Sequence, residues 1–125
     1  MGYYMHQREN SFFLPKEKQQ EALKAIKIAG ENKPRIFGSH ILQAQTLQEV
    51  LDWWCWKPQF DDEGNIVAIH FEGQKSGDDL ELFNAIAPFV KEGSFIEMSG
   101  EDGAIWRYQF DGKICFENYP TISWD

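Results

Sequence analysis

Acidic and aromatic side chains lie close together in the C-terminal half of the chain, where their types could do chemistry. The densest stretch is GSFIEMSGEDGAIWRYQF, residues 93–110. Two alternating runs flank its GEDG centre, which predicts a β-hairpin. Alternate side chains of a strand share a face, so the question is whether the carboxylates and the aromatic rings meet on one side of the sheet.

A pairing of Ser99 with Ala104 across GEDG would place Glu97 opposite Trp106. A two-residue turn at Asp111-Gly112 would place Glu117 opposite Trp106 on the next strand. One face of the sheet then carries Phe95, Glu97, Trp106, Tyr108, Phe110, Cys115 and Glu117. The other carries Ile96, Met98, Ile105, Ile114 and Phe116, together with Arg107 and Gln109. We expect the aliphatic face to pack under the helices and the aromatic face to be partly exposed. In the alternative, Trp106 and Tyr108 form the core.

Glu97 and Glu117 would form the pair of carboxylates that glycosidases use, within about 10 Å of each other at strand spacing. A chain of 125 residues offers little wall for a sugar cleft, so no catalytic residue is predicted. A binding surface for a ligand or partner is the stronger prediction, because aromatic rings beside charged groups line many such surfaces. Its candidate residues are Glu97, Trp106, Tyr108, Glu117, Glu101, Asp102 and Trp53.

The sequence predicts neither a metal site nor a cofactor. His6, His40 and His70 are scattered and lack the spacing of metal ligands. The DDEGN stretch, residues 61–65, lacks the ligand spacing of a calcium loop and is typical of a hairpin turn. Phosphate-loop and nucleophile-elbow motifs are absent from the sequence.

Charge and length limit the class of protein further. The 125 residues predict a single domain, residues 1–125. Residues 1–60 carry eight Lys or Arg and six Asp or Glu, a net charge of +2, whereas residues 61–125 carry four and fourteen, a net charge of −10. The sum is the total of −8. This acidity disfavours nucleic acid and anionic membranes and favours a basic protein as partner. With no leader-like or membrane-spanning run, we expect a cytoplasmic protein.

The two cysteines and the WWCW run are interpreted structurally. Cys55 and Cys115 are separated by 60 positions and form no C-x-x-C pair, so free, buried thiols are expected. In the tryptophan run, Trp54 falls on the apolar stripe of a helix and Trp56 begins a strand. Trp53 points away from that stripe, which makes it a candidate exposed anchor for a partner.

Periodicity and turn residues predict three helices. Pro15 begins the first and Gly30 ends it, a connecting loop follows over 31–45, and a capping box of Thr46 and Glu49 begins the second. The third covers 78–90, with Asp78 as its cap and an early end at Pro88. Residues 3–7 and 11–14 flank a polar RENS bend and predict a short strand or edge ribbon. Further strands are expected near 56–60, 66–72, 94–99, 104–110 and 113–119.

This order predicts an α+β fold with a largely antiparallel sheet of five or six strands and two or three helices on one face. The strand 66–72, the helix 78–90 and the strand 94–99 can form a right-handed crossover, which favours a ferredoxin-like variant. The alternative is a sheet with the same layers and another strand order.

The run from Trp56 to Lys113 resembles a family of small bacterial and phage-associated proteins of unassigned function. The resemblance covers roughly residues 46–125, and GSFIEMSGEDGAIWRYQF is its most particular part. It implies a bacterial origin and no activity. The main functional hypothesis is a non-enzymatic acidic binding protein, such as an inhibitor or immunity-type partner of a basic protein. The alternatives are a small-molecule-binding protein or minor hydrolase using Glu97, Trp106, Tyr108 and Glu117, and a homo-oligomeric structural protein.

Overall fold

The computed structural model describes residues 3–73 and 77–120. Six strands lie in this part of the chain: β1 (Met5–Ser11), β2 (Trp56–Phe60), β3 (Ile66–Phe71), β4 (Phe95–Gly100), β5 (Ile105–Phe110) and β6 (Cys115–Asn118). Its α-helices are α1 (Gln19–Asn32), α2 (Pro34–Phe37), α3 (Leu47–Trp53) and α4 (Asp79–Ile86). Short 3-10 turns, η1 (Lys16–Lys18), η2 (Ser39–Gln43) and η3 (Ala87–Phe89), adjoin α1, α2 and α4.

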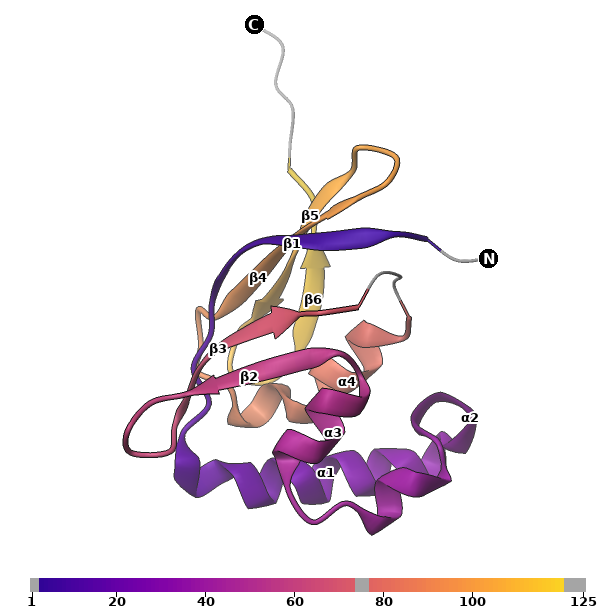
Figure 1. The fold of residues 1–125 in the computed structure, drawn as a ribbon, viewed down its shortest axis with the longest axis vertical. Helices are drawn as coiled ribbons and strands as arrows, with labels where there is room; N and C mark the ends of the chain where they lie inside the picture. Colours follow the sequence, from indigo (N-terminus) through magenta and orange to yellow (C-terminus); the bar gives the residue numbers. More distant parts are fainter. Residues whose placement is uncertain (1–2, 74–76, 121–125) are drawn as a thin grey trace, which may run out of the picture.

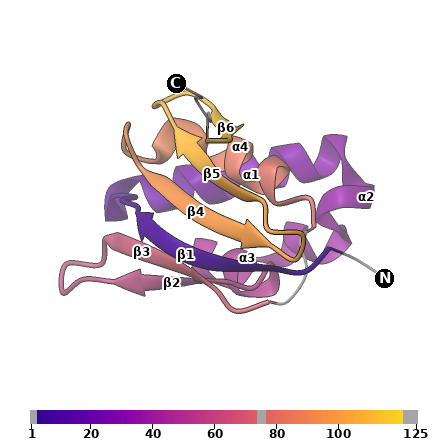
Figure 2. The same cartoon turned by 90° about the horizontal axis from the view of Figure 1, so that it is seen from above.

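The fold is α+β, as the sequence predicts. Four strands form an antiparallel sheet in the order β1-β4-β5-β6, and β2 and β3 form a separate antiparallel pair. The predicted crossover within one sheet is therefore wrong, because β3 pairs with β2 rather than with a strand of the larger sheet. In Figure 1 the helices lie toward the lower part of the molecule. Seen from above, the strands follow one another as β2, β3, β1, β4, β5 and β6, and the helices lie behind them (Figure 2).

Strands β1 and β3 do not form a backbone ladder with each other. Side chains of β1 join the two sheets instead. Gln7 donates from Nε2 to the carbonyl of Ile69 at 2.9 Å and accepts from the amide of Phe71 at 2.7 Å. Asn10 accepts from the amide of Ile69 at 3.3 Å. These three contacts satisfy backbone groups that would otherwise be unpaired at the edge of β3, so β1 acts as a bridge between the sheets.

The core is rich in aromatic rings. Trp56, at the start of β2, is fully buried and lies 4.9 Å from the Phe83 ring of α4, centroid to centroid. Phe83 in turn lies 5.0 Å from the ring of Tyr108 on β5. Such tilted and edge-on contacts suit the charge distribution of aromatic rings. They tie α4 to both sheets.

The helices confirm part of the predicted boundaries. The amide of Glu49 donates to Thr46 Oγ1 at 3.2 Å, so the predicted cap of α3 is present. Helix α4 ends at Ile86 and continues as the turn η3, which contains Pro88, so the early end is confirmed as well. Asp78 is the N-cap residue of α4, but its side chain makes no capping hydrogen bond, and that detail of the prediction is wrong.

Residues 31–45 differ from the predicted connecting loop. Helix α1 runs past Gly30 to Asn32, and α2 and η2 follow. Gly30 is buried, and a Cβ there would lie 3.5 Å from the Cβ of Phe37 and 3.6 Å from Ile41. These are ordinary van der Waals distances, so Gly30 packs against the following segment and does not end the helix.

Both C-terminal hairpins are displaced from the predicted register. Gly100 donates to the carbonyl of Ala104 at 2.9 Å, so only residues 101–103 form the first loop. Gly103, with φ +86°, supplies the left-handed conformation that three-residue hairpin loops require. Ser99 therefore pairs with Ile105. In the second hairpin Phe110 pairs with Cys115 rather than with Lys113, which leaves the faces unchanged.

Candidate functional site

The aromatic face of β5 is core and is not partly exposed, so that expectation is wrong. Trp106 is 5% exposed and Tyr108 is 3% exposed. They share the inner face with Ile96 and Met98, because Met98 pairs with Trp106 and Ile96 with Tyr108. These pairs form because Ser99 pairs with Ile105 rather than with Ala104, a shift of one residue at the GEDG loop. On the opposite face Ile114 and Phe116, expected in the core, are exposed.

Glu97 does not face Glu117, so the carboxylate pair of the hydrolase hypothesis does not form. Glu97 pairs with Arg107 on the outer face of the sheet, whereas Glu117 pairs with the inward-facing Tyr108. Arg107 Nε donates to Glu97 Oε1 at 2.9 Å, and Arg8 Nε donates to Oε2 at 3.0 Å. These two guanidinium groups, Arg107 first, lower the pKa of Glu97. Its carboxylate is thus engaged in ion pairs.

Four of the seven candidate residues do gather around one cavity of about 560 Å³, which we name the acidic recess. They are Asp102, Trp106, Tyr108 and Glu117. Strand β5 and the turn before it provide the first three, and the edge strand β6 provides Glu117. Of the other three candidates, Glu101 lies in the 101–103 loop and its carboxylate accepts from the amide of Tyr4 at 3.0 Å.

Additional acidic groups line the same recess from the start of α4. Asp78 and Glu81 contribute two more carboxylates, so four acidic side chains surround the cavity. Glu81 also meets Lys33 Nζ at 2.8 Å. Among the described residues that line the recess, none is Lys or Arg. Lys33 offsets the charge of Glu81 from outside the lining, and the recess as a whole carries a net negative charge.

Aromatic rings form the wall of the acidic recess around Trp106. The centroid of Trp106 lies 6.2 Å from that of Tyr3 and 6.3 Å from that of Tyr119. Its indole Nε1–H is buried and has no acceptor in the described part of the chain. The Trp106 ring lies edge-on to that of Tyr108, with the two centroids 6.3 Å apart. A buried donor without a partner is costly.

Burial, hydrogen bonding and nearby carboxylates raise the pKa values of the three tyrosines of the recess. A hydrogen bond from Tyr3 to Asp102 is the main cause that raises the pKa of Tyr3 to about 12, and it lowers the pKa of Asp102. Burial raises the pKa of Tyr119, with further contributions from the charges of Glu117 and Asp102. Burial also raises the pKa of Tyr108. Negative charge opposes the ionisation of a phenol, so these shifts agree in sign.

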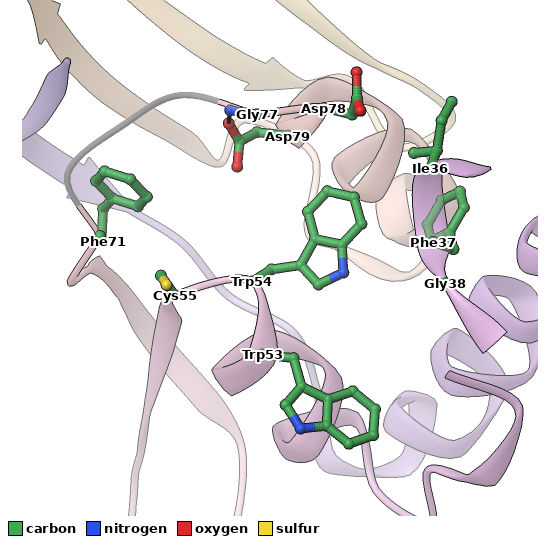
Figure 3. Close-up of a pocket in the computed structure, with 11 residues that line it drawn as sticks. Ile36, Phe37, Gly38, Trp53, Trp54, Cys55, Phe71, Gly77, Asp78 and Asp79 are labelled. Atoms are coloured by element: carbon green, nitrogen blue, oxygen red, sulfur yellow. Dashed lines mark hydrogen bonds between the residues drawn. The ribbon is translucent and has the colours of Figure 1, made fainter. Parts of the chain in front are cut away.

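A second cavity of about 570 Å³ contains the remaining candidate, Trp53 (Figure 3). We name it the aromatic pocket. Its walls come from α2, the corner between α3 and β2, and the end of β3, through Phe37, Trp53, Trp54 and Phe71. Trp53 is 45% exposed, as the sequence predicts. Cys55, expected to be buried, is exposed here as a free thiol, whereas Cys115 is free and buried.

Asp79 is the residue of this region that sequence reasoning missed. It is 4% exposed, lines the aromatic pocket and accepts from Trp56 Nε1 at 2.8 Å. Its other oxygen accepts from the amide of Gly77 at 2.9 Å. Burial raises its pKa. The available signal was the indole of Trp56, because a buried tryptophan N–H usually needs an acceptor.

Comparisons with known proteins add no relative: family models, curated proteins and solved structures gave no significant match to this chain. The resemblance to small bacterial proteins stays a prediction. In the described part of the chain, no helix combines the length and the apolar character needed to cross a bilayer.

Proposed function

We propose that this protein is a non-enzymatic binding protein that captures a basic partner protein through the acidic recess. The observation that carries the proposal is the convergence of four carboxylates and four aromatic rings on one cavity whose described lining contains no basic residue. A Lys or Arg side chain of a partner is the group that such a cavity complements. Carboxylates accept from its charged N–H groups, and an aromatic ring attracts the cation.

The distribution of charge over the chain supports the same partner. The segment 61–125, which forms most of the recess, has a net charge of −10. A field of this sign accelerates the approach of a basic protein and slows that of an acidic one. A bacterial, cytoplasmic inhibitor or immunity-type protein would use such a surface, and we include that role in the proposal.

The homo-oligomer hypothesis was based on an exposed aromatic face. That face is buried, so the hypothesis needs another surface. Ile114, just before β6, and Phe116, on β6, are 51% and 39% exposed. The hydrolase hypothesis loses its carboxylate pair, since Glu97 is bound by Arg8 and Arg107. A capture surface for a basic partner is the function that the geometry favours.

Selection from a random peptide display library tests the proposal. We expect enrichment of peptides that contain Arg or Lys, with binding that weakens about tenfold between about 20 mM and about 300 mM NaCl, because screening shortens the range of the charges. The variant Glu81→Gln/Glu117→Gln should lose about tenfold in affinity for the selected peptides, the equivalent of about 1.4 kcal/mol.

A matched control removes the same charge elsewhere. Glu31 and Glu63 are exposed residues outside the recess, so Glu31→Gln/Glu63→Gln keeps the total charge equal to that of the recess variant. The control should retain affinity within about twofold at moderate salt. Equal losses in the two variants, or selected peptides without basic residues, would contradict capture at the recess.

A further inference from the structure

The aromatic pocket has the features of a small-molecule site. Its volume of about 570 Å³ lies within the range of about 300–1,000 Å³ that is typical of ligand pockets. Aromatic side chains form much of its wall, and the polar groups are few. Figure 3 shows Trp54 centrally, with Phe71 on one side and Phe37 on the other. The ring centroids of Phe37 and Trp54 are 5.5 Å apart, so this part of the wall is preformed.

The chain turns sharply at one corner of the aromatic pocket, between α3 and β2. Cys55 has φ +64°, the one non-glycine residue of the described chain in the left-handed region, where the chain turns from α3 into β2. Its carbonyl accepts from the amide of Glu72 at 2.8 Å, which fixes the corner against the end of β3. Gly73 lies next to the same corner. A Cβ on Gly73 would lie 2.8 Å from the ring of Phe71, which is too close for two carbon atoms. Because Gly73 has no side chain, the Phe71 ring can lie beside Cys55.

The charge of the pocket is negative. Asp78 is exposed at its edge and Asp79 is buried in its wall. Asp79 receives two hydrogen bonds, from the Trp56 indole and the Gly77 amide, both neutral donors. A carboxylate has about four acceptor positions, so these two donors from the described residues do not occupy all of them. No Lys or Arg occurs among the described residues that line the pocket, and a buried carboxylate without a cation is unfavourable.

We infer that the aromatic pocket binds a small organic cation, an ammonium or guanidinium group carried on an apolar body of about ten non-hydrogen atoms. The apolar body packs against Trp54 and Phe71. The cation lies beside the rings and near Asp78 and Asp79, where its positive charge complements the two carboxylates. Aromatic rings with an adjacent carboxylate are a general arrangement for recognising alkylammonium groups.

This site is distinct from the capture of a basic protein. The aromatic pocket and the acidic recess share Gly77 and Asp78, and their other lining residues differ. Of these two cavities, Trp53, Trp54 and Cys55 line only the pocket, whereas Glu81 and Glu117 line only the recess. Occupancy of each cavity can therefore be measured separately, and failure of one proposal leaves the other standing.

The exposed thiol of Cys55 reports occupancy of the pocket. Three probes of nearly equal size and different charge are added to the full chain: 2-phenylethylammonium, the neutral 2-phenylethanol and the anion phenylacetate. The rate of alkylation of Cys55 by neutral iodoacetamide is followed by peptide mass spectrometry. Cys115 is buried, and burial raises its pKa to about 12, so it serves as an internal control for unfolding.

A Kd of about 1 mM is the range expected for a cation of this size. At about 10 mM, the ammonium probe should then slow alkylation of Cys55 about tenfold by mass action. The neutral alcohol should slow it about twofold, corresponding to a tenfold weaker Kd, and phenylacetate should have no effect. Asp78→Asn should reduce protection by the cation to that by the alcohol, whereas Asp62→Asn, an equal charge change in the β2–β3 turn, should not.

Equal protection by the ammonium and the alcohol would overturn the inference, because the pocket would then select apolar bodies without regard to charge. Absence of protection by all three probes would overturn it as well. Trp53→Leu provides a second variant on the exposed part of the wall, which should weaken protection by the cation about threefold through loss of the ring. Unchanged alkylation of Cys115 in every variant establishes that the chain remains folded.

Discussion

The two faces of the β4–β5 hairpin are built from neighbouring residues and have opposite roles. Trp106 and Tyr108 point inward and are almost fully buried, whereas Arg107, between them, points outward and is paired with Glu97. The inner face contributes to stability through burial of large rings. The outer face holds ion pairs that water screens. Strand β5 is therefore a core strand although it contains a charge, because its one charged side chain, Arg107, lies on the outer face.

The largest effect is expected from replacing a ring on the inner face. Tyr108→Ala should lower the free energy of unfolding by about 3–5 kcal/mol, because it leaves a cavity beside Phe83 and Trp56. Arg107→Ala, one position away, should cost about 1 kcal/mol or less, since it removes an exposed ion pair and the contact of the guanidinium with the Phe95 ring. Urea unfolding followed by tryptophan fluorescence measures both. Comparable losses in the two variants would contradict the assignment of faces.

A smaller effect is expected at Gly100, where the inner face is covered by the N-terminal segment rather than by a helix. A Cβ at this position would lie 1.7 Å from the Tyr3 hydroxyl oxygen. Gly100→Ala should therefore displace Tyr3, break its hydrogen bond to Asp102 and cost about 1–3 kcal/mol. The same urea unfolding experiment measures this cost.

The control for this substitution is the double variant Tyr3→Ala/Gly100→Ala. Removing the Tyr3 ring removes the atoms with which the new Cβ collides. The two changes together should cost less than the sum of the single changes, a coupling that a double-mutant cycle detects. Strict additivity would show that Tyr3 does not cover this end of the sheet.

The smallest effect is expected for Glu97→Gln on the outer face, about 1 kcal/mol at neutral pH. Arg107 and Arg8 hold the pKa of Glu97 below its ordinary value of 4.5. The ionised carboxylate therefore contributes stability above pH 4.5, and that contribution is lost as the pH falls through the lowered pKa of the folded state. The difference between wild type and Glu97→Gln should shrink in this acidic range, as urea unfolding at several pH values will measure. A difference that grows on acidification would contradict the ion-pair assignment.

Much of the secondary structure could be predicted from the sequence, and the reasons are local. Thr46 caps α3 through a hydrogen bond to a residue three positions later, and Pro88 ends α4 because it lacks an amide N–H. Residues 31–45 were mistaken for a loop because Pro34 and Gly38 resemble breakers. Pro34 instead occupies the first turn of α2, where its missing donor costs nothing.

The candidate site was predicted only in part, because its cavity is assembled from distant segments. Asp102, Trp106, Tyr108 and Glu117 were identified from their types and do line one cavity. The contributions of Tyr3 and of the start of α4 depend on long-range packing that strand periodicity does not contain. Glu97 was assigned to the wrong face, because the pairing across GEDG depends on whether the loop contains three residues or four.

The sequence by itself determined that the chain is an α+β protein with an acidic C-terminal half and an exposed Trp53. These properties follow from composition, local turn chemistry and helical periodicity. Only the tertiary structure decided which face of the hairpin is core and which carboxylates meet. Alternation divides a strand into two faces without saying which one the helices cover. That choice is made by burial of Trp106 and Tyr108 beneath α4 and the neighbouring rings, which leaves Arg107 and Glu97 in contact with water.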